Sequence, residues 1–159
     1  LRCVSYVPLR SQSDDLVDSS VRTTVTISDD SPYDERTSGS GCSPNGCTPE
    51  NTRDGDTSEE SRWSCKYALE DTTCKVTYYF EEPQDIVELK VAFYKGDQRS
   101  RSLKIKLNGD TFETITSSGE TTDLETWTLN SDETASLTLE ASGLGDSEWL
   151  SITEVLLPR

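Results

Sequence analysis

Short runs of alternating apolar and polar residues, separated by turn-forming residues, limit this 159-residue chain to few folds. Alternation with a period of two places one face of a strand against a core and the other toward solvent. No stretch has a convincing helical period, and many short strands between turns indicate an all-β, antiparallel sandwich. We expect strands at residues 21–27, 75–80, 87–94, 103–107, 112–116, 127–129, 135–139 and 152–157.

The alternation also predicts which side chains form the core and where the chain is unstructured. Asn108-Gly109 predicts a tight hairpin turn. Residues 1–20 are weakly patterned and form either an N-terminal extension or an edge strand, so the domain itself spans 21–159. Residues 29–52 form a long polar loop, and loops of that length are usually functional or disordered. The expected core residues are Trp63, Val76, Tyr78, Phe80, Val87, Leu89, Val91, Phe93, Leu103, Ile105 and Leu107.

The charge of the chain excludes several classes of partner. The sequence has 30 acidic and 15 basic residues, which gives a formal net charge of -15. Such a field repels nucleic acid and anionic membranes, and no apolar run is long enough to insert into a membrane. Histidine is absent, which removes the commonest general base and the Ser-His-Asp arrangement.

Five cysteines without metal-type spacing indicate an oxidising compartment, so we expect a secreted or cell-surface protein. Cys65 and Cys74 could staple a hairpin, and Cys42 and Cys47 could close a small loop. Cys3 is then left to pair outside this chain or to change these assignments. The chain starts at Leu1 without a signal peptide, which we interpret as a processed or excised piece of a secreted protein.

The stretch 51–64, Asn-Thr-Arg-Asp-Gly-Asp-Thr-Ser-Glu-Glu-Ser-Arg-Trp-Ser, is the most informative local pattern. Asp54 and Asp56 flank Gly55, which suits a tight turn. Two carboxylates on one turn repel each other unless a cation lies between them, and Ca²⁺ prefers such oxygen ligands. The simpler alternative is a solvated acidic turn.

This stretch resembles the signature of discoidin domains, also called factor V/VIII C-type domains, which include carbohydrate-binding module family 32. Residues 91–99, Val-Ala-Phe-Tyr-Lys-Gly-Asp-Gln-Arg, are similar to a strand and loop of such modules attached to alginate lyases. Residues 148–155, Glu-Trp-Leu-Ser-Ile-Thr-Glu-Val, resemble their closing strand. The resemblance covers roughly residues 45–157 and implies a jelly-roll sandwich of the galactose-binding-domain type, with loops gathered at each end.

The resemblance also implies a structural Ca²⁺ that joins the loop before Trp63 to the last strand. Compared with the family pattern, this chain has two extra residues, within 57–60, between Asp56 and Ser61. This insertion affects Ser61 most, and Glu59 or Glu60 could take its place as a ligand. The set amounts to about six oxygens, the lower end of the range for Ca²⁺. The implied ligands are Asn51 and Thr153 through their carbonyls, and Asp54, Asp56, Ser61 and Glu154 through their side chains.

A small basic island, Lys95, Arg99 and Arg101, lies within this acidic chain. Arg99 and Arg101 share the parity of the inward-facing Leu103, so we expect them where the sandwich opens. There they could bind carboxylates of uronic acids, or alternatively form internal salt bridges. Lys104 and Lys106 have the opposite parity and are interpreted as ordinary solvated residues.

Aromatic side chains near loops could stack on the C–H faces of sugar rings. Tyr94 and Trp149 are the candidates, with burial in the core as the alternative, and Arg62 is a further candidate contact. We therefore expect a non-catalytic module that binds an extracellular, acidic, alginate-like polysaccharide within a larger protein or assembly. The alternative is an adhesion or matrix domain that binds protein partners.

Overall fold

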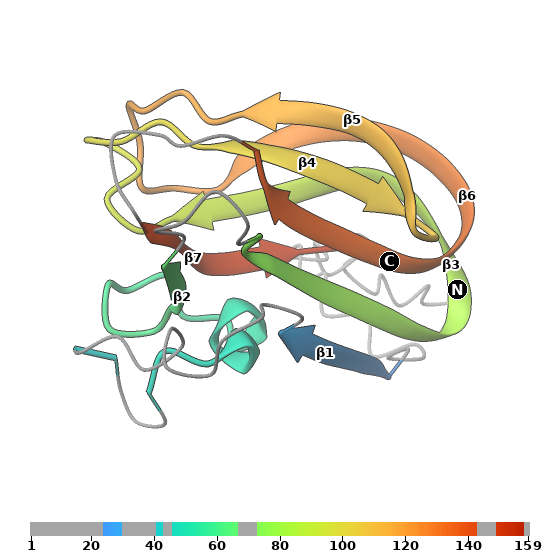
Figure 1. Ribbon diagram of the computed structural model, residues 1–159, viewed down its shortest axis with the longest axis horizontal. Helices are drawn as coiled ribbons and strands as arrows, with labels where there is room; N and C mark the ends of the chain where they lie inside the picture. The colour runs from blue at the N-terminus through green and yellow to red at the C-terminus, as the bar shows by residue number, and fades with distance from the viewer. Residues whose placement is uncertain (1–23, 30–40, 43–45, 67–72, 143–148, 158–159) are drawn as a thin grey trace, which may run out of the picture.

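The computed structural model describes residues 24–29, 41–42, 46–66, 73–142 and 149–157 (Figure 1). The predicted N-terminal extension and Cys3 lie outside these residues, so the predicted boundary after residue 20 does as well. The elements are β1 (Val25–Asp29), the 3₁₀ helix η2 (Pro49–Arg53), β2 (Trp63–Lys66), β3 (Lys75–Phe93), β4 (Ser102–Leu107), β5 (Asp110–Thr116), β6 (Glu125–Ala141) and β7 (Trp149–Leu156).

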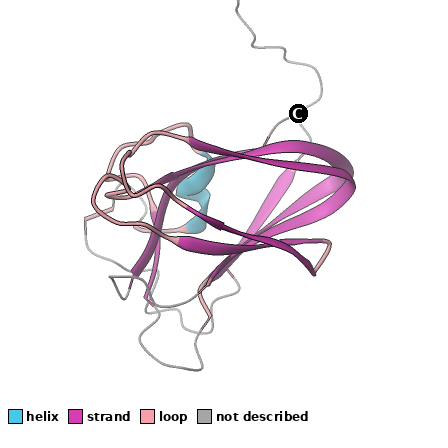
Figure 2. Ribbon diagram, turned by 90° about the horizontal axis from the view of Figure 1, so that it is seen from above, coloured by secondary structure: helices cyan, strands magenta, loops and turns pink. Residues whose placement is uncertain are grey.

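All strand pairs are antiparallel, and two long strands connect them into one curled sheet in the order β2-β7-β3-β6-β4-β5, with β1 also paired to β3. The first part of β3 pairs with β1 and with the end of β6. Its last part pairs with β7 and with the start of β6. The sheet thus folds over itself into two layers, β1-β3-β6-β4-β5 and β2-β7-β3-β6, which curve around the core in Figure 2. The predicted antiparallel jelly-roll sandwich is confirmed.

The corner between the two layers lies where β3 and β6 bend together. Their register shifts between Tyr79 and Gln84 and twice more before Glu88, and β-bulges of this kind bend a strand sharply. Separate strands at 75–80 and 87–94 were therefore the wrong prediction, and so were separate strands at 127–129 and 135–139. Both strands run through the corner and Gln84 pairs with Thr134 there, although polar side chains interrupt the alternation that sequence patterns rely on.

The core lies between the two layers and contains most of the predicted residues. Trp63, Val76, Tyr78, Leu89 and Leu103 are fully buried, and Ile105, Val91, Phe93 and Leu107 join the same cluster. Phe80 is only partly buried against it. Val87 was wrongly predicted to face inward: it is 54% exposed, because the bulges before Glu88 shift the alternation along β3.

The β4–β5 hairpin has the predicted turn. Asn108 and Gly109 both have positive φ, 52° and 88°, as a two-residue type I′ turn requires. The Asn108 side chain also accepts hydrogen bonds from the backbone N–H groups of Ala135, at 2.7 Å, and Ser136, at 3.2 Å. The turn is therefore tied to the neighbouring strand β6 as well as closing its own hairpin.

The predicted cysteine pairs both form disulfides, Cys42–Cys47 and Cys65–Cys74. The second does not staple a hairpin, however. β2 pairs with β7, whereas β3 begins in the other layer, beside β1 and β6. Because Cys65 lies in β2 and Cys74 precedes β3, this buried bridge joins the two layers.

The end of the region predicted as a long polar loop, residues 29–52, overlaps η2. Thr52 anchors this turn to β3, because its hydroxyl donates to Pro49 O at 2.7 Å and lies 2.8 Å from the hydroxyl of Tyr78. A single 3₁₀ turn of this length has no helical periodicity in the sequence, which is why it was missed. It is also far too short to cross a membrane, and the described residues contain no helix that could.

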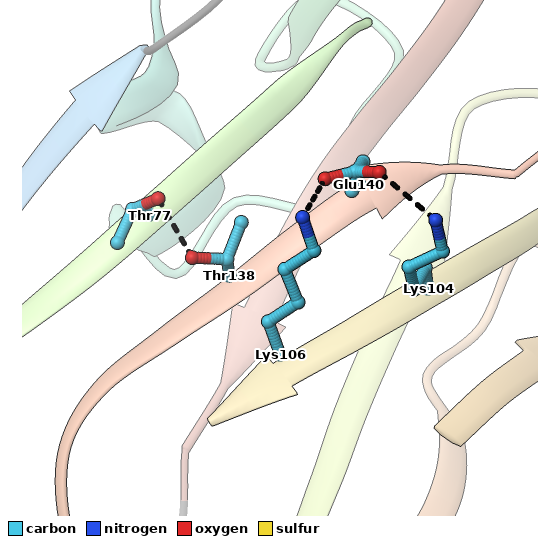
Figure 3. Close-up of polar contacts among 5 residues, drawn as sticks. All are labelled: Thr77, Lys104, Lys106, Thr138 and Glu140. Atoms are coloured by element: carbon cyan, nitrogen blue, oxygen red, sulfur yellow. Dashed lines mark hydrogen bonds and ion pairs between the residues drawn. The ribbon is translucent and has the colours of Figure 1, made fainter. Parts of the chain in front are cut away.

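A polar network covers the outer side of the five-stranded layer (Figure 3). Glu140 on β6 pairs with Lys104 at 3.3 Å and Lys106 at 2.5 Å, and both lysines lie on β4. Beside them, the hydroxyls of Thr77 and Thr138 are 2.8 Å apart across β3 and β6. Burial opposes ionisation of Glu140, but the hydrogen bonds from Lys106 and Lys104 outweigh it and lower its pKa. The two lysines expected to be simply solvated therefore connect strands.

The lowered pKa of Glu140 predicts a loss of stability in acid. A carboxyl group whose pKa is lower in the folded protein stabilises it above the unfolded pKa, and this contribution disappears as pH falls through the folded value. Between about pH 6 and pH 3, the wild-type protein should lose roughly 1 kcal/mol more unfolding free energy than Glu140→Gln. Urea unfolding at each pH measures the difference, and identical pH profiles for the two proteins would contradict it.

Candidate functional site

The acidic turn and the last strand meet, although they are far apart in the sequence. Gly55, with φ of 81°, donates its backbone N–H to Glu154 Oε2 at 2.9 Å. Ser61 donates its hydroxyl to Asp54 Oδ2, while Asp54 Oδ1 accepts the N–H of Asp56 at 2.8 Å. Three of the residues expected to bind a cation, Asp54, Ser61 and Glu154, therefore lie around one corner, which we call the acidic corner.

A bulge in β7 places Glu154 in this corner. Ala92 pairs with Glu154 and Phe93 with Ile152, so Thr153 is the extra residue between them. The bulge resets the alternation, which lets Ile152 and Val155 both face the core while Glu154 turns toward Gly55. Thr153 is buried, and its hydroxyl has no hydrogen-bond partner among the described residues.

The electrostatics of the acidic corner suit a cation. Glu154 is only 3% exposed. Burial raises its pKa to about 7, and the negative charges of Asp54 and Asp56 add to this, against the opposing effects of the Gly55 N–H and Arg53. A cation would relieve this penalty by favouring the charged carboxylate.

The geometry of the acidic corner is less complete. Asp56 is exposed, and its carboxylate accepts the N–H of Ser58 at 2.8 Å. Hydrogen bonds from Ser58 lower the pKa of Asp56, so this group is already stabilised as an anion. The described residues contain no group of three or more His, Cys, Asp or Glu side chains arranged to hold a metal. The donors nevertheless fit Ca²⁺ chemically, because the expected set adds a hydroxyl and backbone carbonyls to the carboxylates.

A second group of predicted residues lies on the outer face of the β2-β7-β3 layer. Trp63 and Cys65 face the core, so Arg62, Ser64 and Lys66 alternate to the opposite side. Lys66 pairs with Trp149 and Ser64 with Ser151. The Ser64 and Ser151 hydroxyls are 2.8 Å apart, which confirms that these side chains share a face.

Tyr94 joins this face from the end of β3, where its N–H donates to Ser151 O at 3.2 Å. The Arg62 guanidinium lies 4.3 Å from the centre of the Tyr94 ring, and the Lys95 ammonium lies 5.3 Å from it. Lys66 lies 6.0 Å from the centre of the Trp149 ring. Both aromatic rings are half-buried and carry cations close by, so we call Arg62, Lys66, Tyr94, Lys95 and Trp149 the aromatic–cationic face.

Arg99 and Arg101 lie in and beyond the loop that follows Tyr94. Arg101 is 5% exposed, its Nη1 donates to Ser100 O at 2.7 Å, and its backbone pairs with Ser117. Arg99 is half-buried. A Cβ added at Gly96 would lie 2.3 Å from Thr121 O, so this loop packs tightly against the loop after β5. Arg101 thus supports the loop from within. Its burial agrees with the inward parity, whereas its predicted role in binding uronic acids or in an internal salt bridge stays a prediction.

Solved structures with the same fold identify the type of domain. The CBM32 of AlyQ, solved in complex with 4,5-unsaturated mannuronic acid, has a TM-score of 0.64 and 26% identity, over 86% of this chain and 94% of that one. This chain also covers 34% of a truncated AlyQ with CBM32 and alginate lyase domains. A pectin-binding carbohydrate-binding module matches with a TM-score of 0.63 and 21% identity, over 86% and 89% of the two chains.

An F5/8 type C domain from Bacteroides fragilis matches with a TM-score of 0.58 and 14% identity, over 84% of this chain and 89% of that one. The chain is a structural match to the CBM32 and F5/8 type C domains. No family model and no curated protein matches the sequence. The resemblance to discoidin-type modules is confirmed, and it is carried by structure together with a few local motifs.

One residue beside the acidic corner and one on the aromatic–cationic face were missed in the sequence. Asn51 was considered only for its carbonyl, but its side-chain Nδ2 donates to Gly46 O at 2.8 Å and Arg62 O at 3.0 Å. Lys66 was not considered, although its position two residues beyond Ser64 puts it on the same face as Arg62. That strand parity was a usable signal for Lys66, whereas nothing in the sequence indicated the partners of the Asn51 amide.

The buried amide of Asn51 predicts a specific cost in stability. In Asn51→Asp a carboxylate would face the carbonyls of Gly46 and Arg62 without a proton to donate, so the unfolding free energy should fall by about 2 kcal/mol. Urea unfolding at neutral pH measures this. Asn130→Asp, at an exposed position that adds the same charge, is the control and should change stability little. Equal stabilities for the two variants would contradict the role of the amide.

Proposed function

We propose that this CBM32-like module is non-catalytic and binds an extracellular, acidic polysaccharide of the alginate type, with a structural Ca²⁺. We further propose that it belongs to a larger secreted protein and has neither nucleic acid nor membrane as a partner. The observation that carries the proposal is the stacked arrangement of Arg62, Tyr94 and Lys95, with Trp149 and Lys66 on the same face.

The chemistry of this face matches a polyuronate. An aromatic ring packs against the C–H face of a sugar, and a guanidinium forms paired hydrogen bonds with a carboxylate. Each repeating unit of a polyuronate offers both surfaces. Arg99 is an additional proposed contact, whereas Arg101 would act by supporting the adjoining loop. The AlyQ module, which carries a mannuronic acid derivative in its structure, supports this ligand class at 26% identity.

A weak grip of this kind is sufficient for an anchoring role. A module joined to a second domain keeps that domain at high local concentration on its polymer, even when a single contact dissociates readily. The net charge of -15 opposes long-range attraction of a polyanion, so binding should depend on short-range contacts and weaken with added salt.

Electrophoresis in gels containing alginate tests the proposal against gels containing a neutral glucan. The wild-type protein should be retarded only by alginate. Arg62→Ala should weaken binding about tenfold or more, because one charge-assisted hydrogen bond contributes about 1.5–3 kcal/mol. Trp149→Ala should also weaken binding, because it removes a ring on which a sugar can pack. Lys104→Ala removes a positive charge from the other layer and should bind as the wild type does. Disulfide-linked oligomers without glycan binding would instead support an adhesion domain.

The cation proposal has its own test. The proposed Ca²⁺ ligands are the side chains of Asp54, Asp56, Ser61 and Glu154 and the carbonyls of Asn51 and Thr153. The ion would neutralise the buried charge of the acidic corner. At about 100 times its dissociation constant, Ca²⁺ should raise the melting temperature by roughly 5–10 °C over a chelator. Glu154→Gln should lose this shift, whereas Glu140→Gln, a matched change elsewhere, should retain it. A melting temperature that is the same with and without chelator would reject the ion.

A further inference from the structure

The stacking of Arg62 on Tyr94 needs an explanation, because arginine has a long side chain that loses much rotamer entropy when it is fixed. Two backbone carbonyls hold its guanidinium. Arg62 Nη1 donates to Gly41 O at 3.3 Å and to Glu59 O, while the group lies 4.3 Å from the Tyr94 ring centre. The arginine is therefore held by contacts from both its own segment and the loop before η2.

The backbone of Arg62 is held by the same loop. Asn51 bridges Gly46 O and Arg62 O through a single side-chain nitrogen, at 2.8 Å and 3.0 Å. Two residues further along, Ser64 N donates to Cys47 O at 3.4 Å. Asn51 thus links the carbonyl of Gly46 to the carbonyl of Arg62, while the carbonyl of Gly41 accepts from the Arg62 guanidinium.

The Cys42–Cys47 disulfide connects these two anchors. Gly41 precedes Cys42, and its carbonyl accepts from the Arg62 guanidinium. Gly46 precedes Cys47, and its carbonyl accepts from Asn51, which also donates to Arg62 O. The two cysteine Cα atoms are 5.1 Å apart. Gly41 has φ of 87°, and a Cβ added there would lie 3.8 Å from Arg62 Nη2, which shows how closely this backbone approaches the guanidinium.

We propose that the Cys42–Cys47 disulfide and Asn51 position Arg62 against Tyr94, and thereby set the affinity of the module for acidic glycans. The effect on affinity rests on the function proposed above, whereas the effect on the arginine itself does not. A bridge between cysteines five positions apart closes a small loop, and the gain in stability from a disulfide grows with loop length. Because so short a bridge adds little stability, holding a binding residue in place is the better explanation of its presence.

A double-mutant cycle separates positioning from general stabilisation. The pair Cys42→Ser and Cys47→Ser is introduced into the wild type and into Arg62→Ala, and binding of an alginate oligosaccharide is measured by calorimetry. We expect about a tenfold loss in the wild-type background and no further loss when Arg62 is already absent. Melting temperatures should fall equally in both backgrounds, since that change does not pass through Arg62.

Equal losses of affinity in the two backgrounds, or none in the wild type, would overturn the proposal.

A second readout needs no glycan: ¹⁵N relaxation of Arg62 Nε should report a more mobile side chain in the double serine variant and in Asn51→Asp. Unchanged relaxation would overturn the positioning role even if alginate does not bind. Failure of the wild type to bind alginate would count against the proposed function alone. If the double serine variant does not fold, Asn51→Asp alone carries the relaxation test, and unchanged Arg62 relaxation in that variant would overturn the proposal.

Discussion

The pairing of β3 with β6 is the interaction on which both layers depend. Each strand crosses the corner between the layers, so their hydrogen bonds hold β1, β4 and β5 on one side and β7 with β2 on the other. The bulges near Gln84 let this pairing continue while the sheet turns, and the apolar side chains of both layers then enclose one core. The position of every surface residue follows from that register, because a slip of one residue would exchange the core face with the outer face.

The alternation of inward-facing and outward-facing side chains along each strand explains how an acidic chain presents positive charge on its surface. The outer face of the smaller layer gathers cations beside aromatic rings, and in the larger layer two lysines share Glu140. A cation close to an aromatic ring is attracted to the negative face of the ring. A lysine paired with a carboxylate has little net charge to offer. Among the described residues, the smaller layer therefore places basic side chains beside aromatic rings, and the larger layer places two of them beside a carboxylate.

The sequence alone was sufficient for the fold class and the hairpin turn, because period-two alternation and Asn108-Gly109 are local signals. Short spacings suggested both cysteine pairs but left the connectivity open, and the structure supplied it. It was insufficient where tertiary pairing overrides a local pattern. The polar residues between Phe80 and Ile86 look like a connection, yet β3 runs through them and Gln84 pairs with Thr134 of β6. The bulge at Thr153 and the partners of the Asn51 amide depend on neighbours from distant segments, which no spacing encodes. Residues of the acidic corner could be selected by family resemblance, but not the details of their contacts.

The two sites are joined by a single peptide bond. Ser61 donates its hydroxyl to Asp54 in the acidic corner, while the next residue, Arg62, extends to Tyr94 on the aromatic–cationic face. Trp63 follows and is fully buried, so Ser61 and Arg62 cannot move far without displacing a large ring in a close-packed core. Glu59 adds a second connection, because its carbonyl accepts from Arg62 within the segment that links Asp56 to Ser61. Order in the acidic corner must therefore limit the freedom of Arg62, and the ion and the glycan proposed for this module would favour the same conformation of one short segment.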